Sequence, residues 1–169
     1  YLKAAAAGHD TTIRRPRDDL KSLKFDWNNS IYHSKAYVVI RMLADLTGPD
    51  RFLSIMRALT SDYRHRCLAS EEFQRTVEAI ADRKLDWFFQ DWVDGNAKAR
   101  FAIEQVTARD GTVEVVVRRT GEARFPVEVR LTAADGRESV QRMAYDAGRQ
   151  TLVFSSTSPP KRVEIDPRG

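Results

Sequence analysis

The spacing of apolar residues along the chain changes near residue 98. Up to that point apolar side chains recur every three or four residues, which is the spacing of an amphipathic helix. From about residue 99 onward they alternate with polar side chains, which is typical of half-buried strands. The sequence therefore predicts an α+β protein in sequence-separated units, an α-helical bundle over residues 1–98 followed by a β-sandwich over residues 99–169.

Four main helical stretches are predicted in the first unit, after a short helix tail closed by Gly8 and a polar connector over residues 9–24. Asn28, Asn29 and Ser30 are expected to cap the first stretch, because their side chains can accept bonds from unpaired helix N–H groups. Gly48 and Pro49 are expected to end one helix and begin the next. The first stretch covers residues 31–47, the second begins at residue 49, the third begins at residue 70 and the fourth covers residues 85–93. In the same order, the residues expected to be buried are Ala36/Val39/Ile40/Leu43/Leu46, Phe52/Ile55/Met56/Leu59, Phe73/Val77/Ile80 and Leu85/Phe88/Phe89/Trp92.

Six short strands separated by turn signals are predicted in the second unit. The alternation is clearest in Val113, Val115 and Val117, and again in Val127, Val129 and Leu131. This pattern favours a small immunoglobulin- or fibronectin-like sandwich, although the Cys-Trp-Cys core of antibody domains is absent. The expected strands cover residues 100–108, 112–119, 125–132, 138–145, 150–155 and 162–165.

Charge and composition narrow the classes of partner. The net charge of +4 is spread along the 169 residues without a basic block, so neither nucleic-acid binding nor membrane association is expected. No apolar run approaches the roughly 20 residues that a membrane span needs. Because the chain begins at Tyr1 rather than at a methionine, we expect a piece of a longer soluble protein, and we favour a cytoplasmic location.

A self-contained catalytic apparatus is not recognisable in the sequence. The chain has one cysteine, Cys67, and three histidines, His9, His33 and His65, whose spacings fit no local metal motif. No metal or cofactor site is therefore predicted in this chain, and the histidines are expected to be surface or structural residues.

Two segments resemble the gluzincin zinc aminopeptidases, the family that includes alanyl and puromycin-sensitive aminopeptidases. The run from Tyr32 to Leu43, with Gly48 and Phe52 after it, is similar to that family's Y-x-K-G-A element and the apolar helix that follows it. The run from Lys84 to Val93, KLDWFFQDWV, is similar to the family's D-L-D-W-F-F-x-Q-W-L element.

The resemblance covers about residues 30–169 and implies the C-terminal portion of such a peptidase, without its zinc-binding part. In this family a β-sandwich often follows the aromatic element and ends in V-x-x-D-P, the form of residues 163–167. The family's zinc is held by an H-E-x-x-H helix and a later Glu, which this chain lacks. The resemblance thus implies a zinc-containing parent protein, in which this piece contributes a cleft wall, is inactive alone, and has the upstream catalytic domain and a peptide substrate as partners.

One catalytic residue of the family has a counterpart here. A tyrosine of the Y-x-K-G element donates a hydrogen bond to the developing oxyanion of the substrate. When Lys35 is placed on the family lysine, His33 falls on the tyrosine position and Tyr32 lies one residue early. Tyr32 is therefore either the oxyanion donor or an ordinary aromatic residue at the helix start, and His33 is the alternative donor in the shifted register.

Two further alternatives concern the aromatic run and the chain as a whole. The helical spacing of Leu85, Phe88, Phe89 and Trp92 indicates a buried seam between the helices and the sandwich rather than a platform on which nucleic-acid bases stack. The rival to a peptidase piece is a non-catalytic protein-interaction scaffold module of the same superfamily.

Overall fold

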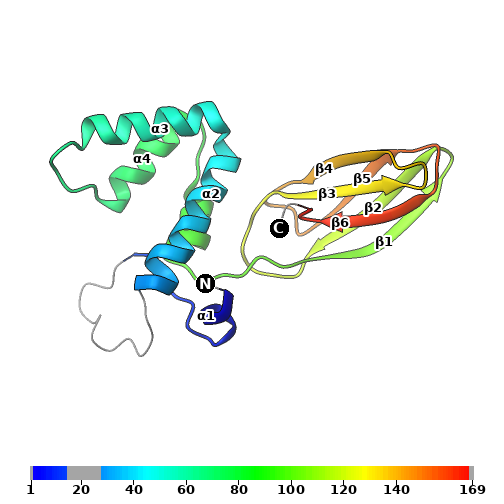
Figure 1. The fold of residues 1–169 in the computed structure, drawn as a ribbon, viewed down its shortest axis with the longest axis horizontal. Helices are drawn as coiled ribbons and strands as arrows, with labels where there is room; N and C mark the ends of the chain where they lie inside the picture. Colours follow the sequence, from blue (N-terminus) through cyan, green and yellow to red (C-terminus); the bar gives the residue numbers. More distant parts are fainter. Residues whose placement is uncertain (1, 15–27, 168–169) are drawn as a thin grey trace. The chain divides into compact units, whose positions relative to one another are not determined.

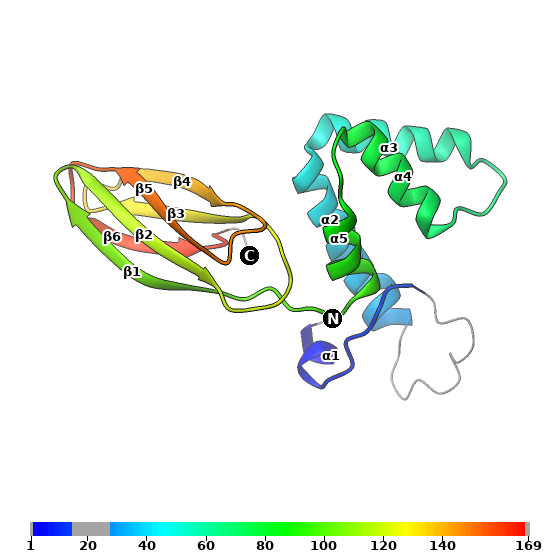
Figure 2. The same cartoon turned by 180° about the vertical axis from the view of Figure 1, so that it is seen from behind.

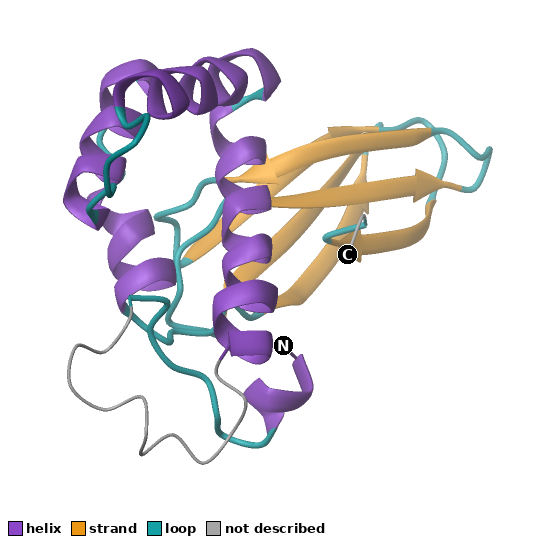
Figure 3. Ribbon diagram, turned by 60° about the vertical axis from the view of Figure 1, so that its left-hand side comes forward, coloured by secondary structure: helices purple, strands orange, loops and turns teal. Residues whose placement is uncertain are grey.

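The structure is a computed structural model, and it describes residues 2–14 and 28–167. The chain divides into two compact units, Tyr1–Asn96 and Ala97–Gly169 (Figure 1). Among the described residues, the regular structure of the first unit is helical and that of the second consists of strands (Figure 3). The chain is thus α+β in separate units, as the change in apolar spacing predicts. Most of the connector predicted at residues 9–24 lies outside the described residues.

The helical unit contains α1 and four longer helical stretches, two of which include π-helical turns. The bounds are α1 Leu2–Ala6, η1 Asn28–Lys35, α2 Ala36–Thr47, α3 Pro49–Asp62, α4 Ser70–Ala81, α5 Asp86–Phe88 and η2 Phe89–Asp94, where η marks a π-helical segment.

The junction between α2 and α3 forms as the sequence predicts. Gly48 has a φ of 83°, a conformation that residues with a side chain rarely adopt, and Pro49 occupies the first turn of α3. Val39 and Leu43 of α2 and Ile55 and Leu59 of α3 are buried. The predicted burial of Met56 is wrong, because its side chain is 37% exposed at the edge of the α3 face that carries Ile55 and Leu59.

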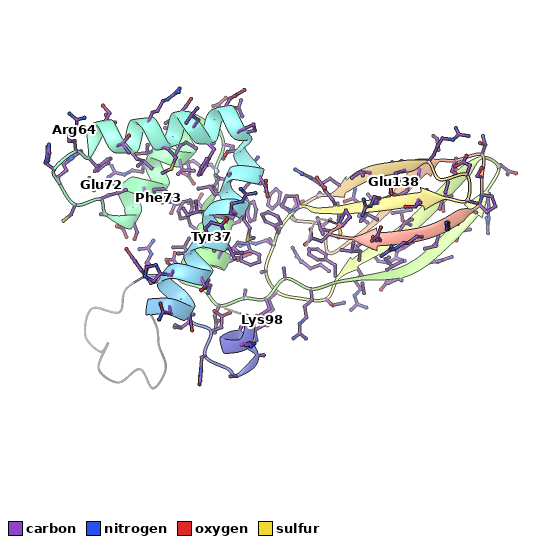
Figure 4. All side chains as sticks on the ribbon, viewed as in Figure 1. Tyr37, Arg64, Glu72, Phe73, Lys98 and Glu138 are labelled. Atoms are coloured by element: carbon purple, nitrogen blue, oxygen red, sulfur yellow. The ribbon has the colours of Figure 1, made fainter. Side chains whose placement is uncertain are left out.

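Helix α4 begins where the acidic residues of its first turn predict. The Glu72 carboxylate accepts a hydrogen bond from the Ala69 N–H at 3.0 Å, which satisfies one donor at the helix start. Val77 is fully buried, whereas Phe73, which is labelled on α4 in Figure 4, is only half-buried.

The aromatic segment after α4 forms part of the core of the helical unit. Leu85, Trp87, Phe88 and Phe89 are all at most 8% exposed. The Phe89 ring meets the Phe73 ring edge-on at 5.9 Å and the Phe88 ring at 5.8 Å. Figure 2 shows α5 and the segment after it alongside α2, which η2 contacts. The burial predicted for Leu85, Phe88 and Phe89 is confirmed.

Two details of the aromatic segment differ from the prediction of one amphipathic helix. The chain is α-helical only over α5 and π-helical over η2, so residues after Phe88 turn through a smaller angle per residue. Trp87, which the 3.6-residue period places off the buried face, is 8% exposed, whereas Trp92 is half-buried.

The second unit contains two three-stranded antiparallel sheets with strand orders β1-β2-β5 and β4-β3-β6. The central strands β2 and β3 face a common core made of alternating residues from both sheets, including Val115, Val129 and Phe154. The predicted strands are confirmed to within a few residues at each end. Their bounds are β1 Phe101–Arg109, β2 Thr112–Arg119, β3 Val127–Ala133, β4 Glu138–Met143, β5 Arg149–Ser155 and β6 Pro160–Ile165.

Within the described residues, none of the helices has both the length and the apolar composition that crossing a membrane requires.

Candidate functional site

The candidate site lies on η1, the π-helical turn that leads into α2. Ile31 is fully buried and Lys35 is 3% exposed, so these two side chains hold one side of the turn against the helical unit. The Ser34 hydroxyl donates to the Asn29 carbonyl at 2.6 Å. The predicted N-cap at residues 28–30 is wrong, because these residues already lie inside the π-helical turn, where backbone bonds skip five residues.

Tyr32 and His33 lie on the exposed side of this turn. The Tyr32 side chain is 56% exposed, and His33 is exposed as well. Their rings meet edge to face, with centroids 5.5 Å apart and planes at 81°. The two candidates for the oxyanion donor are therefore neighbours on one surface, and each carries a polar hydrogen, on the Tyr32 hydroxyl or on a ring nitrogen of His33.

Tyr37 extends this aromatic surface along α2 and is absent from the sequence-based candidates. Its side chain is 66% exposed, and the adjacent Val38 is 41% exposed (Figure 4). Both residues lie within an apolar run that the helical period divides between a buried and an exposed face. An apolar residue of such a run that the helical period places on the exposed face is the sequence signal that would have identified Tyr37 and Val38.

Lys35 is the charged residue that the structure places deepest in this region. Its ammonium group donates to Asp10 Oδ1 at 2.9 Å, to the Thr11 carbonyl at 2.7 Å and to the Gly95 carbonyl at 3.1 Å. The Asp10 side chain is itself only 4% exposed. Because an ammonium has three donors, these three acceptors satisfy all of them, as a buried charge requires.

The partners of Lys35 belong to a strap formed by residues 10–14, which runs along the end of η2. The Thr12 hydroxyl and the Ile13 N–H both donate to the Val93 carbonyl at 2.9 Å. Arg14 forms ion pairs with Asp94 and with Glu71, the latter at 2.5 Å. The strap therefore joins the start of α4 and the end of η2 to the turn that carries Tyr32.

The metal-ligating residue types do not gather in the described part of the chain. In residues 2–14 and 28–167, no group of three or more His, Cys, Asp or Glu side chains is placed to hold a metal ion. Cys67 is exposed, and His9, His33 and His65 lie on separate segments. What the described site can do chemically is donate hydrogen bonds, from Tyr32 or His33, to an oxygen that approaches the turn.

Comparison with known proteins gives a match in structure alone. Models of known protein families do not match the sequence, and neither do the sequences of curated proteins. The structure matches part of a crystal structure of Legionella pneumophila aminopeptidase A in complex with aspartic acid, with a TM-score of 0.61 and 13% sequence identity. The match covers 78% of this chain but 16% of that one, so the chain spans about a sixth of the aminopeptidase and resembles that part of it in fold.

Proposed function

We propose that this chain is the C-terminal part of an aminopeptidase-like zinc metallopeptidase, in which it supplies one wall of the active-site cleft and a β-sandwich. The observation that carries the proposal is the exposed Tyr32 on a turn anchored by Lys35, in a chain that has the fold of part of an aminopeptidase. The upstream catalytic domain and a peptide substrate are its partners in the parent protein, and the piece alone cleaves nothing.

The proposal divides the chain into residues 1–98, which end the catalytic region, and residues 99–169, which form an immunoglobulin/fibronectin-like sandwich. The antiparallel sheets with strand orders β1-β2-β5 and β4-β3-β6 support this class of sandwich. The described residues hold no zinc site, so the zinc that activates water in such enzymes belongs to another part of the parent protein.

Tyr32 has the chemistry that the proposal needs. A phenol hydroxyl that points toward the substrate carbonyl donates a hydrogen bond as negative charge develops on the oxygen. This bond is stronger in the transition state than in the bound substrate. It therefore raises the rate of the chemical step and has little effect on substrate affinity. His33 is the alternative donor, because one of its ring nitrogens carries a hydrogen in either tautomer.

The test is Tyr32→Phe in the full-length parent protein. Removal of the hydroxyl is expected to lower kcat by about a hundredfold or more, as loss of an oxyanion donor does, with a much smaller change in KM. His33→Ala is the matched control on the neighbouring position. If Tyr32→Phe keeps full turnover and His33→Ala abolishes it, His33 is the donor; if both variants keep full turnover, the assignment of this turn to the active site is wrong.

The second candidate function is a non-catalytic protein-interaction scaffold. Exposed apolar side chains on α2 and α3 favour it, namely Tyr37, Val38, Leu53 and Met56, which are 37–66% exposed. The coding sequence upstream of Tyr1 distinguishes the two functions. An H-E-x-x-H motif followed by a Glu roughly twenty residues later supports the peptidase, and its absence supports the scaffold.

A further inference from the structure

The Lys35 side chain, at the end of η1, is held by directional bonds to segments that are distant in the sequence. Its three acceptors are Asp10 Oδ1, the Thr11 carbonyl and the Gly95 carbonyl, at 2.7–3.1 Å. Two of these acceptors precede Lys35 in the sequence by 24–25 residues, and the third follows it by 60 residues. The ammonium is therefore bound by two segments that lie outside the turn itself.

The other buried residue of the turn does not supply this constraint. Ile31 is fully buried, but apolar burial is non-directional and tolerates rotation of a helix about its axis. A charged hydrogen bond weakens steeply when its angle departs from linearity. Lys35 therefore sets the rotation of the turn, whereas Ile31 sets how closely the turn packs.

Rotation of η1 about its axis matters because Tyr32 and His33 lie on its exposed side, away from the buried Lys35. Tyr32 and His33 are consecutive, and one residue corresponds to about 100° around an α-helix. A change from the π-helical turn to an ordinary α-helical turn would alter the rotation per residue and so change the directions in which both side chains point.

We propose that Lys35, through its buried bonds to Asp10 and to the Thr11 and Gly95 carbonyls, is a positioning residue that fixes the π-helical turn and so determines the direction in which Tyr32 and His33 are presented at the site. The proposal rests on the proposed function for the role of the site, but not for the geometry of the turn. The strap of residues 10–14 contributes to the same positioning, because its bonds to Val93 and Asp94 hold Asp10 in place.

The structural part is tested by amide hydrogen exchange in the full-length protein. Lys35→Met with Asp10→Asn removes both buried charges together, which is far better tolerated than leaving one unpaired. Exchange of the peptide over residues 29–37 is expected to become at least about tenfold faster, while α4, residues 70–81, stays unchanged. Unchanged exchange over 29–37 would overturn the proposal, and so would an equal increase in α4, which would make the pair a general stabiliser.

The functional part is tested by a double-mutant cycle with Tyr32→Phe. If the turn is displaced, kcat of the Lys35→Met/Asp10→Asn protein falls by about a hundredfold, the effect of roughly 1 Å of misplacement, with KM nearly constant. Tyr32→Phe should then cost much less in this background than in the unaltered protein, because the hydroxyl is already out of position. Equal costs in both backgrounds would contradict a positioning role.

Two controls keep the outcomes separate. Lys35→Arg keeps a positive charge opposite Asp10 but replaces the three N–H donors of the ammonium with the planar guanidinium group. This variant is used for the measurement if the double variant does not fold. Smaller changes in the same direction are expected for it, and unchanged exchange over residues 29–37 overturns the proposal here too. If Tyr32→Phe and His33→Ala both leave turnover intact, the assignment of this turn to the active site fails, while the exchange measurement still decides whether Lys35 fixes the turn.

Discussion

The Glu78 carboxylate accepts a hydrogen bond from the Leu85 N–H at 2.8 Å and so connects α4 to the aromatic segment that follows it. The same carboxylate receives the Gln74 side-chain amide at 3.2 Å and the Lys84 ammonium at 3.4 Å. Leu85 is fully buried, and its N–H lies at the start of α5. Glu78 therefore satisfies a donor that a helix start leaves unpaired.

Replacement of Glu78 is expected to destabilise the helical unit. Glu78→Ala leaves the Leu85 N–H without its acceptor, which costs about 1–3 kcal/mol of unfolding free energy. Glu78→Gln keeps an acceptor oxygen and should lose less. Urea denaturation followed by tryptophan fluorescence measures the difference, because all three tryptophans precede residue 97. Equal stabilities for the two variants would show that the acceptor oxygen is not what matters.

Glu78 also makes the stability of the helical unit depend on pH. Burial of the carboxylate raises its pKa, but the hydrogen bonds from Leu85, Gln74 and Lys84 outweigh burial and hold the pKa below its ordinary value. A depressed carboxyl pKa contributes stability above the value in the unfolded chain, about 4.3, and this contribution is lost as the pH falls through the folded-state value. The difference in unfolding free energy between the unaltered protein and Glu78→Gln should therefore be largest at pH 7 and become smaller below about pH 4. A gap that is constant over this range would contradict the shift.

Phe89 is expected to be a principal determinant of the stability of the helical unit. Its ring is 1% exposed and contacts the rings of Phe73 and Phe88. Phe89→Ala should cost about 3–5 kcal/mol through lost burial and the cavity that remains. Tyr37→Ala, at an aromatic side chain that is 66% exposed, is the control and should change stability by less than about 0.5 kcal/mol. Tryptophan fluorescence in urea distinguishes the two, and similar losses would contradict the assignment of Phe89 to the core.

The order and type of the elements were predictable because they depend on local patterns. The strand over residues 112–119 and the Gly48–Pro49 junction both follow from spacing and backbone preferences within a few residues. The π-helical winding was not predictable, because an apolar period of 3.6 does not report bonds that skip five residues. The same cause explains why Trp92, which was expected on the buried face, is only half-buried, since Trp92 lies within η2.

The site was predictable only in part, for a different physical reason. Tyr32 and His33 were suggested by the resemblance of the segment around Lys35 to the aminopeptidase family, and the structure places both on one exposed turn. The pairing of Lys35 with Asp10 was missed because the partners are 25 residues apart, and a single charged residue in a polar connector carries no sign of its partner. Long-range ion pairs of this kind are determined by tertiary structure rather than by sequence periodicity.

The chain by itself is expected to retain no zinc. Catalytic zinc takes about three protein ligands, whereas His9, His33 and His65 lie on separate segments and Cys67 is exposed. Purified chain that has been dialysed against a chelator and then against metal-free buffer should contain much less than one equivalent of zinc. One retained equivalent would contradict this and would require ligands drawn from these side chains and nearby carboxylates.

Gly121 is the glycine of the β unit that should tolerate a side chain least. Its backbone lies against the segment that leads into β1, where the Thr120 and Gly121 N–H groups both donate to the Arg100 carbonyl at 2.8 and 3.1 Å. A Cβ atom at Gly121 would stand 2.1 Å from the Lys98 carbonyl oxygen and 2.5 Å from the Arg100 nitrogen. Both of these are backbone atoms, which cannot yield by a change of rotamer.

Gly121→Ala must therefore separate the two backbone segments and weaken the bonds between them, at a cost of about 1–3 kcal/mol or more. Gly148→Ala is the matched control, because a Cβ atom there meets nothing within 4 Å, and its effect should be within about 0.5 kcal/mol of zero. Tryptophan fluorescence does not report on this unit, since no tryptophan follows residue 92. Amide exchange of residues 113–117 in the centre of β2 is the suitable measurement, with faster exchange expected for Gly121→Ala alone. Equal exchange in both variants would mean that the two segments separate without loss of the sandwich, and the close approach at Gly121 would then play no part in its stability.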